Sequence, residues 1–228
     1  MLFTPLFANR TEAGRQLAEV IQRLLQQRTL ETGVQPIPII YALPRGGLAV
    51  AAPVADLLGC PLTIVVAKKI SHPDNPELAI GAVTAGGSVL WADLRKLYLR
   101  QSFRSRDQAV KIAMQQAQSL QLKLSFACPQ VNTEGSTMIL IDDGIATGMT
   151  IAAAANALRK LLPAEIWLCA PVAPFKLLPC LQEWGDRVIT LATPEPFISV
   201  SHFYRDFPQL TTEEALSYLE SHSEYSQE

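Results

Sequence analysis

The residues best suited to chemistry are two adjacent carboxylates, Asp142 and Asp143, in the stretch TMILIDDGIATGMT at positions 137–150. They follow a short apolar run, residues 138–141, whose pattern predicts a strand buried on both faces of a parallel sheet. Ligands of open α/β sheets bind in the crevice outside the carboxyl ends of such strands. We therefore expect the two carboxylates to face a ligand.

A turn containing glycine follows the carboxylates and leads into a predicted helix. Gly144 and Gly148 free this turn, and Thr147 to Thr150 can direct successive backbone N–H groups and two hydroxyls into one concavity. Such a concavity favours an anion, usually a phosphate. Carboxylates beside an anion-binding turn suit one ligand that carries hydroxyls and a phosphate, such as a phosphorylated ribose. The alternative is a plain βα turn with an N-cap aspartate.

A second glycine-rich turn, ALPRGG at positions 42–47, follows an apolar strand predicted at residues 39–41. Gly46 and Gly47 permit a positive φ and a close approach of the backbone to a ligand. Arg45 offers a planar guanidinium fork for phosphate oxygens. A simple tight turn explains these residues equally well when they are taken alone. At the carboxyl edge of the sheet, bare backbone together with one guanidinium suits an oxyanion such as pyrophosphate.

Two lysines, Lys68 and Lys69, follow a third apolar run at residues 62–67. If this run is one strand of the sheet, it delivers both lysines to the carboxyl edge where the other polar residues lie. One lysine is then expected to face the pyrophosphate. The alternative is a solvated end of the strand.

Apolar strands that alternate with helices predict an α/β fold with a mainly parallel, five-stranded sheet flanked by helices. Residues 166–172 and 188–191 supply the last two strands. Residues 78–83 and 88–91 are expected to pair with each other across a glycine turn. The first predicted helix is capped by Asn9 or Thr11 and ends near Thr32 and Gly33. The second spans residues 48–58 and is ended by Gly59, and the others span residues 102–124, 151–162, 175–184 and 212–219.

The composition is that of a globular protein with small-molecule ligands. Of the 228 residues, 49% are hydrophobic and 18% are charged, and the net charge is -2, so neither disorder nor a basic surface for nucleic acid is indicated. No apolar run approaches the roughly 18 residues of a membrane span. The four cysteines are scattered and form no zinc or redox motif. We expect one cytoplasmic domain, residues 1–228, that binds neither nucleic acid nor membrane.

Two regions outside the strand–helix pattern are candidates for covering the site. Residues 71–77, SHPDNPE, suit either a mobile flap or a rigid turn. Residues 194–228, with help from residues 1–10, are expected to form a small hood and the tail of the chain. Phe203 or Tyr204 could stack on an aromatic ring of a ligand. The alternative is a hydrophobic cluster that anchors the end of the chain.

The stretch IDDGIATGMT resembles the phosphoribosyl-pyrophosphate signature of the type I phosphoribosyltransferases, and ALPRGG resembles their pyrophosphate loop. The resemblance extends over most of the chain, to a predicted bacterial subgroup of that family. It implies the type I fold with a small hood. It also implies transfer of phosphoribosyl from phosphoribosyl pyrophosphate to a nitrogenous base or another nitrogen acceptor, with release of pyrophosphate.

The resemblance also implies a role for each motif residue. Asp142 and Asp143 would hold the ribose hydroxyls, and Arg45 would stabilise the departing pyrophosphate, so these three are the expected catalytic residues. Mg²⁺ is the expected cofactor, held mostly by substrate oxygens and water, with any link to the two aspartates running through water. The expected substrate-binding residues are Arg45, Gly46, Gly47, Lys68, Lys69, Asp142, Asp143, Gly144, Ala146, Thr147, Gly148, Met149, Thr150, Phe203 and Tyr204.

Several other functions compete with this interpretation. A non-catalytic protein that senses phosphoribosyl pyrophosphate or a nucleotide would keep the same residues. An enzyme that makes phosphoribosyl pyrophosphate would need tandem related domains, and the chain contains no internal repeat. The motifs of Walker A hydrolases and α/β-hydrolases are absent from the sequence. The acceptor and the oligomeric state stay open, a homodimer included.

Overall fold

The structure, a computed structural model, describes residues 5–72, 75–92 and 103–222. Its main sheet is parallel, with the strand order β2-β1-β6-β7-β8. The predicted five-stranded parallel sheet is therefore confirmed. These strands are β1 (Pro38–Ala42), β2 (Leu62–Ile64), β6 (Thr137–Ile141), β7 (Glu165–Val172) and β8 (Arg187–Ala192).

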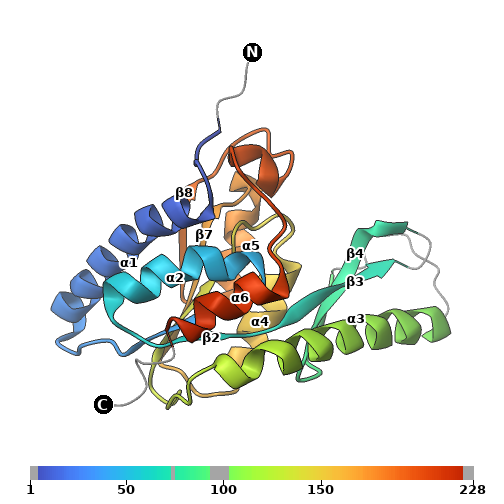
Figure 1. The fold of residues 1–228 in the computed structure, drawn as a ribbon, viewed down its shortest axis with the longest axis horizontal. Coiled ribbons are helices and arrows are strands. Elements are labelled where there is room, and N and C mark those ends of the chain that lie inside the picture. Colours follow the sequence, from blue (N-terminus) through green and yellow to red (C-terminus); the bar gives the residue numbers. More distant parts are fainter. Residues whose placement is uncertain (1–4, 73–74, 93–102, 223–228) are drawn as a thin grey trace.

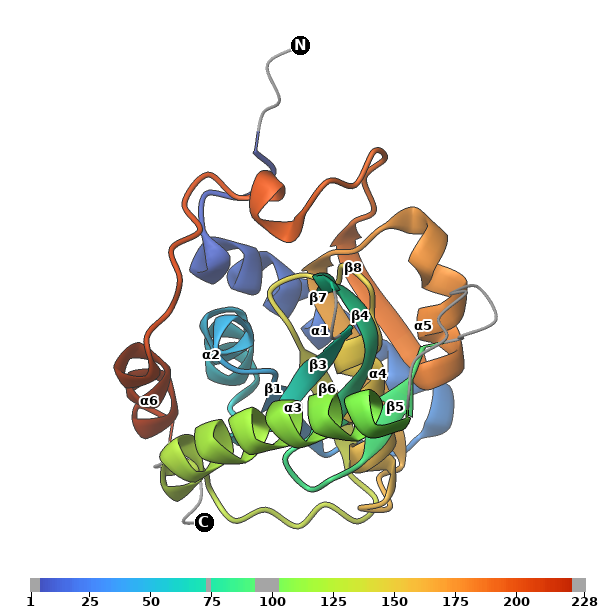
Figure 2. The same ribbon diagram turned by 90° about the vertical axis from the view of Figure 1, so that its right-hand side faces the viewer.

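Helices cover both faces of this sheet (Figure 2). Alternate residues of a strand point to opposite faces, so Ile40 and Ala42 pack in one hydrophobic cluster while Ile39 and Tyr41 pack in another. The first cluster includes residues of α1 (Arg10–Thr32), α2 (Gly46–Leu58) and α6 (Thr212–Glu220). The second includes residues of α4 (Met149–Arg159) and α5 (Leu178–Trp184).

The order of the strands reverses between β1 and β6. From β1 the chain proceeds to β2 on one side, whereas from β6 it proceeds to β7 and β8 on the other. The two central strands pair in register, with Ala42 opposite Ile141. Their loops therefore leave the same edge of the sheet side by side, at the kind of switch point where ligands of α/β sheets bind.

A second, antiparallel sheet contains β3 (Ala67–His72), β4 (Asn75–Thr84) and β5 (Val89–Trp91). With α3 (Phe103–Leu124) it projects beyond the main sheet (Figure 1). The pairing of β4 with β5 confirms the predicted hairpin. The prediction of one strand over residues 62–67 is wrong, because pairing with β1 ends at Ile64 and the chain then enters the second sheet.

The proposed flap and hood are only partly described. Within residues 71–77, Ser71 and His72 belong to β3 and the chain resumes in β4 at Asn75, while residues 73–74 lie outside the described part. The N-terminal segment pairs with the C-terminal one, since the amide of Phe7 donates to the carbonyl of Phe203 and that of Arg205 donates to the carbonyl of Phe7. Residues 1–4 and 223–228 of the expected hood and tail also lie outside the described ranges.

The helix boundaries follow from local capping. Asn9 caps α1, its side chain accepting from the Glu12 amide, and Gly33 ends the helix in a left-handed conformation. A capping box between Thr211 and Glu214 begins α6. None of the helices within the described ranges is long and apolar enough to span a membrane.

Candidate functional site

The acidic pair lies at the end of β6, at the switch point. The amide of Asp142 still donates to the carbonyl of Cys169 on β7, at 3.1 Å, and the amide of Asp143 then turns onto Oδ1 of Asp142, at 2.9 Å. Both side chains are half-buried. The hydrogen bonds between β6 and β7 therefore extend to Asp142 and fix the backbone that carries the acidic pair.

The glycine loop after β1 packs directly against this pair. A Cβ on Gly46 would lie 2.0 Å from Oδ2 of Asp143, and one on Gly47 would lie 2.7 Å from the carbonyl oxygen of Ile141. Neither glycine has the positive φ that the sequence suggested. Glycine is required at both positions because the loop backbone lies so close to Asp143 and to Ile141 that a side chain would not fit. The helix α2 begins at Gly46, two residues earlier than predicted.

The predicted anion turn forms one wall of a pocket of about 270 Å³ beside Asp142. Gly148, with φ of 74°, precedes the first residue of α4, so the start of that helix faces the turn. Met149, also predicted to bind, is the first residue of α4 and lies outside the pocket lining. The lining consists of Lys69, Ala79, Asp142, Gly144, Ile145, Ala146, Thr147, Gly148, Thr150 and Ile151.

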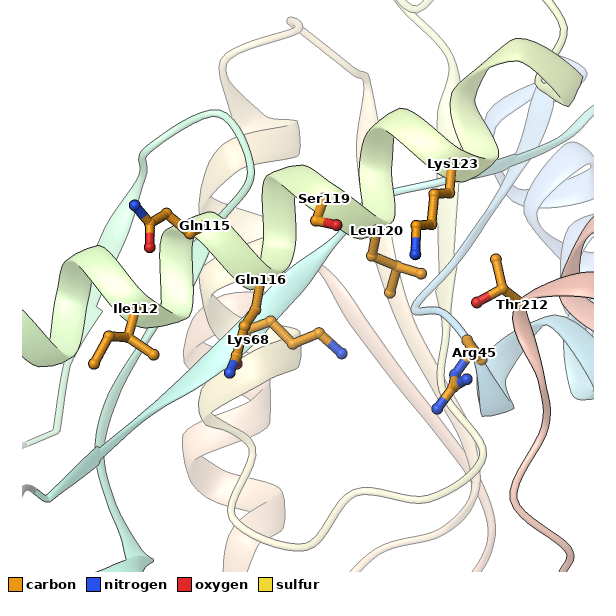
Figure 3. Close-up of a pocket in the computed structure, with 9 residues that line it drawn as sticks. All are labelled: Arg45, Lys68, Ile112, Gln115, Gln116, Ser119, Leu120, Lys123 and Thr212. Carbon is orange, nitrogen blue, oxygen red and sulfur yellow. The ribbon is translucent and has the colours of Figure 1, made fainter.

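A larger pocket of about 590 Å³ lies between α3, β3 and the starts of α2 and α6 (Figure 3). Three cationic side chains line it, Arg45 and Lys68 from the predicted site and Lys123 from α3. Burial, followed by the charge of Arg45, lowers the pKa of Lys68, while Asp142 opposes the shift. An anion placed among these cations would relieve their repulsion.

Strand alternation separates the two lysines. Lys68 lines the larger pocket with Arg45, whereas Lys69 lines the smaller pocket with the anion turn. They are neighbours on β3, so their side chains leave opposite faces of the strand. The second sheet, rather than the end of a core strand, therefore places the two lysines at the site.

The electrostatics of the acidic pair depend on a residue that the sequence analysis missed. Burial, and next the negative charge of Asp143, raises the pKa of Asp142. Burial also raises the pKa of Asp143, and the Arg10 guanidinium opposes this because its Nε lies 2.7 Å from Oδ2. The position of Arg10 in the sequence was a signal for this contact. A positive charge in the first turn of a helix is unfavourable beside the positive end of the helix dipole, and an anionic partner offsets that cost.

The two hood aromatics occupy a buried cluster rather than a binding surface. Phe203 is 0% exposed and Tyr204 is 4% exposed, and they pack with Phe7 and Val172. In this structure neither ring has a free face, so the expected stacking on a ligand ring is replaced by the alternative, a cluster that anchors the chain. The Tyr204 hydroxyl instead donates to the carbonyl of Asp143 at 2.6 Å.

The side-chain atoms at the site that could bind a metal ion are carboxylate oxygens. Throughout the ranges that the structure describes, no three or more His, Cys, Asp or Glu side chains gather into a group that could hold a metal ion. Asp142 and Asp143 are carboxylates of the kind that Mg²⁺ accepts, directly or through water. Two carboxylates alone suit a metal that also takes oxygens from a ligand.

Fold and site together define a class of protein, an open parallel α/β sheet whose switch point carries an acidic pair between an arginine–glycine loop and a second glycine turn that begins a helix. Residues 9–176 match the family model described as the phosphoribosyl transferase domain. The chain belongs to this family.

Relatives share the similarity over nearly the whole chain. Proteins from two strains of Mycobacterium tuberculosis, provisionally named phosphoribosyl transferases, are 30% identical over 230 aligned positions. The alignment covers 97% of this chain but 48% of each relative, so the chain spans about half the length of the curated relatives it matches. A Thermus thermophilus protein of known crystal structure is 30% identical in sequence to this chain. The two structures superpose with a TM-score of 0.72, over 95% of this chain and 99% of the other.

Proposed function

We propose that this protein is a magnesium-dependent phosphoribosyltransferase that uses phosphoribosyl pyrophosphate and releases pyrophosphate. One observation carries the proposal, namely that the acidic pair is bordered by an anion turn on one side and by a cationic pocket on the other. A ribose bound by the carboxylates could then place its 5′-phosphate in the first pocket and its pyrophosphate in the second. The family supports the assignment.

In this proposal each group acts through charge and position. Asp142 and Asp143 accept hydrogen bonds from the ribose hydroxyls and stabilise positive charge that develops on the ring. The turn from Ala146 to Thr150, with Lys69, binds the 5′-phosphate through backbone N–H groups, hydroxyls and the ammonium.

The departing pyrophosphate is stabilised in the larger pocket. Arg45, Lys68 and Lys123 supply the positive charge, and the amide of Gly46 supplies a hydrogen-bond donor. The amide of Gly47 already donates to the carbonyl of Leu43, at 3.1 Å, so Gly47 contributes the close approach of the backbone instead. Mg²⁺ bound to pyrophosphate oxygens, ribose hydroxyls and water, with the carboxylates of the acidic pair in reach, would supply further positive charge. Pyrophosphate leaves toward this pocket, so the acceptor must approach C1 of the ribose from the other side.

Calorimetric titration of phosphoribosyl pyrophosphate, with and without Mg²⁺, tests binding. A pyrophosphate-release assay against purines, pyrimidines and other nitrogen acceptors then tests turnover. Magnesium-dependent binding with release for one acceptor is the expected result. Tight binding without release across the panel would favour a sensor of phosphoribosyl pyrophosphate, and no binding would exclude both functions.

The acidic pair gives the matched mutational test. Asp142→Asn combined with Asp143→Asn should lower turnover by at least about a hundredfold, because two preorganised charges are lost from the transition state. Circular dichroism should show a folded protein. Glu134→Gln, an exposed carboxylate that precedes β6 at the opposite edge of the sheet, is the control and should keep full activity. A double variant with normal turnover would contradict the assignment.

A further inference from the structure

Arg10 joins three parts of the chain at the acidic pair. It is the first residue of α1 and is 7% exposed. Its Nε donates to Oδ2 of Asp143 and its Nη1 donates to the carbonyl of Pro208, each at 2.7 Å. Its guanidinium carbon lies 3.6 Å from the centroid of the Phe207 ring. The planar group is therefore held on two edges and one face.

These contacts leave Asp143 with a defined orientation. Oδ2 already accepts from Arg10 and lies against the backbone of Gly46, where even a methyl group would not fit. A ligand hydroxyl that binds Asp143 is thus directed to the other oxygen, Oδ1. Rotation of the carboxylate would break the ion pair and force Oδ2 away from the space that Gly46 provides.

The same network connects the C-terminal segment, residues 203–208, to the carboxylate. The Tyr204 hydroxyl donates to the Asp143 carbonyl at 2.6 Å, and the Tyr204 ring lies 4.9 Å, between centroids, from the Phe207 ring on which Arg10 stacks. The amides of Arg205 and Asp206 donate to the carbonyls of Phe7 and Ala8, which precede α1. Asp143, Arg10 and this segment therefore support one another.

We propose that Arg10 is a positioning residue that fixes the carboxylate of Asp143 for the ribose hydroxyls and ties residues 203–208 to the acidic pair. The ribose in this statement rests on the proposed function, whereas the tie between the segment and the pair does not. Arg10 does not line the larger pocket, which is proposed to bind pyrophosphate and whose cationic residues are Arg45, Lys68 and Lys123. Its loss should therefore affect ligands with a ribose more than pyrophosphate alone.

The first test compares two ligands by calorimetry in the presence of Mg²⁺. Arg10→Gln should weaken binding of phosphoribosyl pyrophosphate by roughly tenfold or more, since displaced binding groups are costly. Binding of inorganic pyrophosphate should stay close to that of the wild type. Arg10→Lys, which keeps the charge, should recover part of the loss. Arg15→Gln, an exposed arginine on the same helix, is the control. Equal losses for both ligands, or none, would overturn the positioning role.

The second test needs no ligand. Amide hydrogen exchange at Arg205 and Asp206 should be faster in Arg10→Gln than in the wild type and unchanged in Arg15→Gln. If the wild type binds no phosphoribosyl pyrophosphate, the proposed function fails, and this comparison still decides whether Arg10 holds the segment. If Arg10→Gln does not fold, Arg10→Lys replaces it in both tests, because a single ammonium group cannot reproduce both guanidinium contacts, with Asp143 and with Pro208. If Arg10→Lys then showed the same amide exchange and the same affinity as the wild type, the proposal would be overturned.

Discussion

At the scale of single residues, the acidic pair is a site where function opposes stability. Burial raises the pKa of Asp142 and of Asp143, and the negative charge of Asp143 raises that of Asp142 further, while the charge of Arg10 opposes the shift at both carboxylates. Charged groups held in this way are more stable when a ligand supplies hydrogen-bond donors or positive charge. The ligand-free protein therefore maintains an unfavourable arrangement that a bound ligand would relieve.

Asp142→Asn should stabilise the ligand-free protein above acidic pH. The folded chain binds the Asp142 proton more tightly than the unfolded chain, whose carboxyl pKa is about 3.9. Unfolding free energy of the wild type should consequently fall as pH rises from about 4 toward the raised pKa of Asp142, and stay lowered above it. Asparagine does not titrate, and its side-chain oxygen can still accept from the Asp143 amide.

Thermal unfolding over a range of pH, with a chelator present, measures this effect. The melting temperature of Asp142→Asn should exceed that of the wild type at neutral pH, by about 2 to 4 °C for each kcal/mol gained. The difference should shrink as pH falls through the raised pKa of Asp142 and should level off below about 4, where Asp142 becomes protonated in the unfolded chain as well. A difference that stays constant with pH would show that Asp142 carries no such cost.

At the scale of elements, the site depends on how closely α2 approaches the end of β6. Gly46 begins α2 and lies against Oδ2 of Asp143, the oxygen that Arg10 also binds. A methyl group there would have to displace a side chain that is already fixed by an ion pair. The arginine–glycine loop and the acidic pair are thus one structural unit, although they lie on different strands.

Gly46→Ala should lower stability by about 1 to 3 kcal/mol, as overpacking does, and should weaken binding of phosphoribosyl pyrophosphate. Denaturant unfolding and calorimetry measure the two effects. Gly86→Ala is the matched control, because nothing lies within 4 Å of a Cβ at that position and its φ is not positive, so its stability should change by no more than about 0.5 kcal/mol. Similar behaviour of the two variants would contradict the close approach.

At the scale of the whole molecule, the core extends beyond the part that matches the family. The match ends at residue 176, yet the main hydrophobic cluster includes Ile189 of β8 and Ala215 and Leu219 of α6. We therefore expect residues 177–222 to unfold together with the rest of the chain, as one domain.

Leu219→Ala should lower the free energy of unfolding by about 2 to 5 kcal/mol, because it opens a cavity at a side chain that is 0% exposed. Leu30→Ala serves as the control, since Leu30 is 87% exposed and its substitution should change stability by about 0.5 kcal/mol or less. Scanning calorimetry should show one transition in both variants. A separate early transition in Leu219→Ala would show that α6 belongs to another unit.

The sequence by itself determined the features that depend on local pattern. Apolar runs at residues 39–41 and 138–141 predicted strands that the structure contains. Of the two caps predicted for the first helix, Asn9 is the one observed, and Gly33 and Gly59 end helices as predicted. The acidic pair and the glycine turns could be singled out because strand, turn and helix signals depend on residues close in the chain.

The tertiary structure decided the contacts between residues far apart in the chain. Lys68 and Lys69 reach the site on a second sheet, because the pairing of β2 with β1 stops at Ile64. Arg10 meets Asp143, 133 positions away, and Phe203 is buried rather than exposed. Periodicity shows that a side chain is buried or charged, but its partner depends on how helices and strands pack, which no local pattern contains.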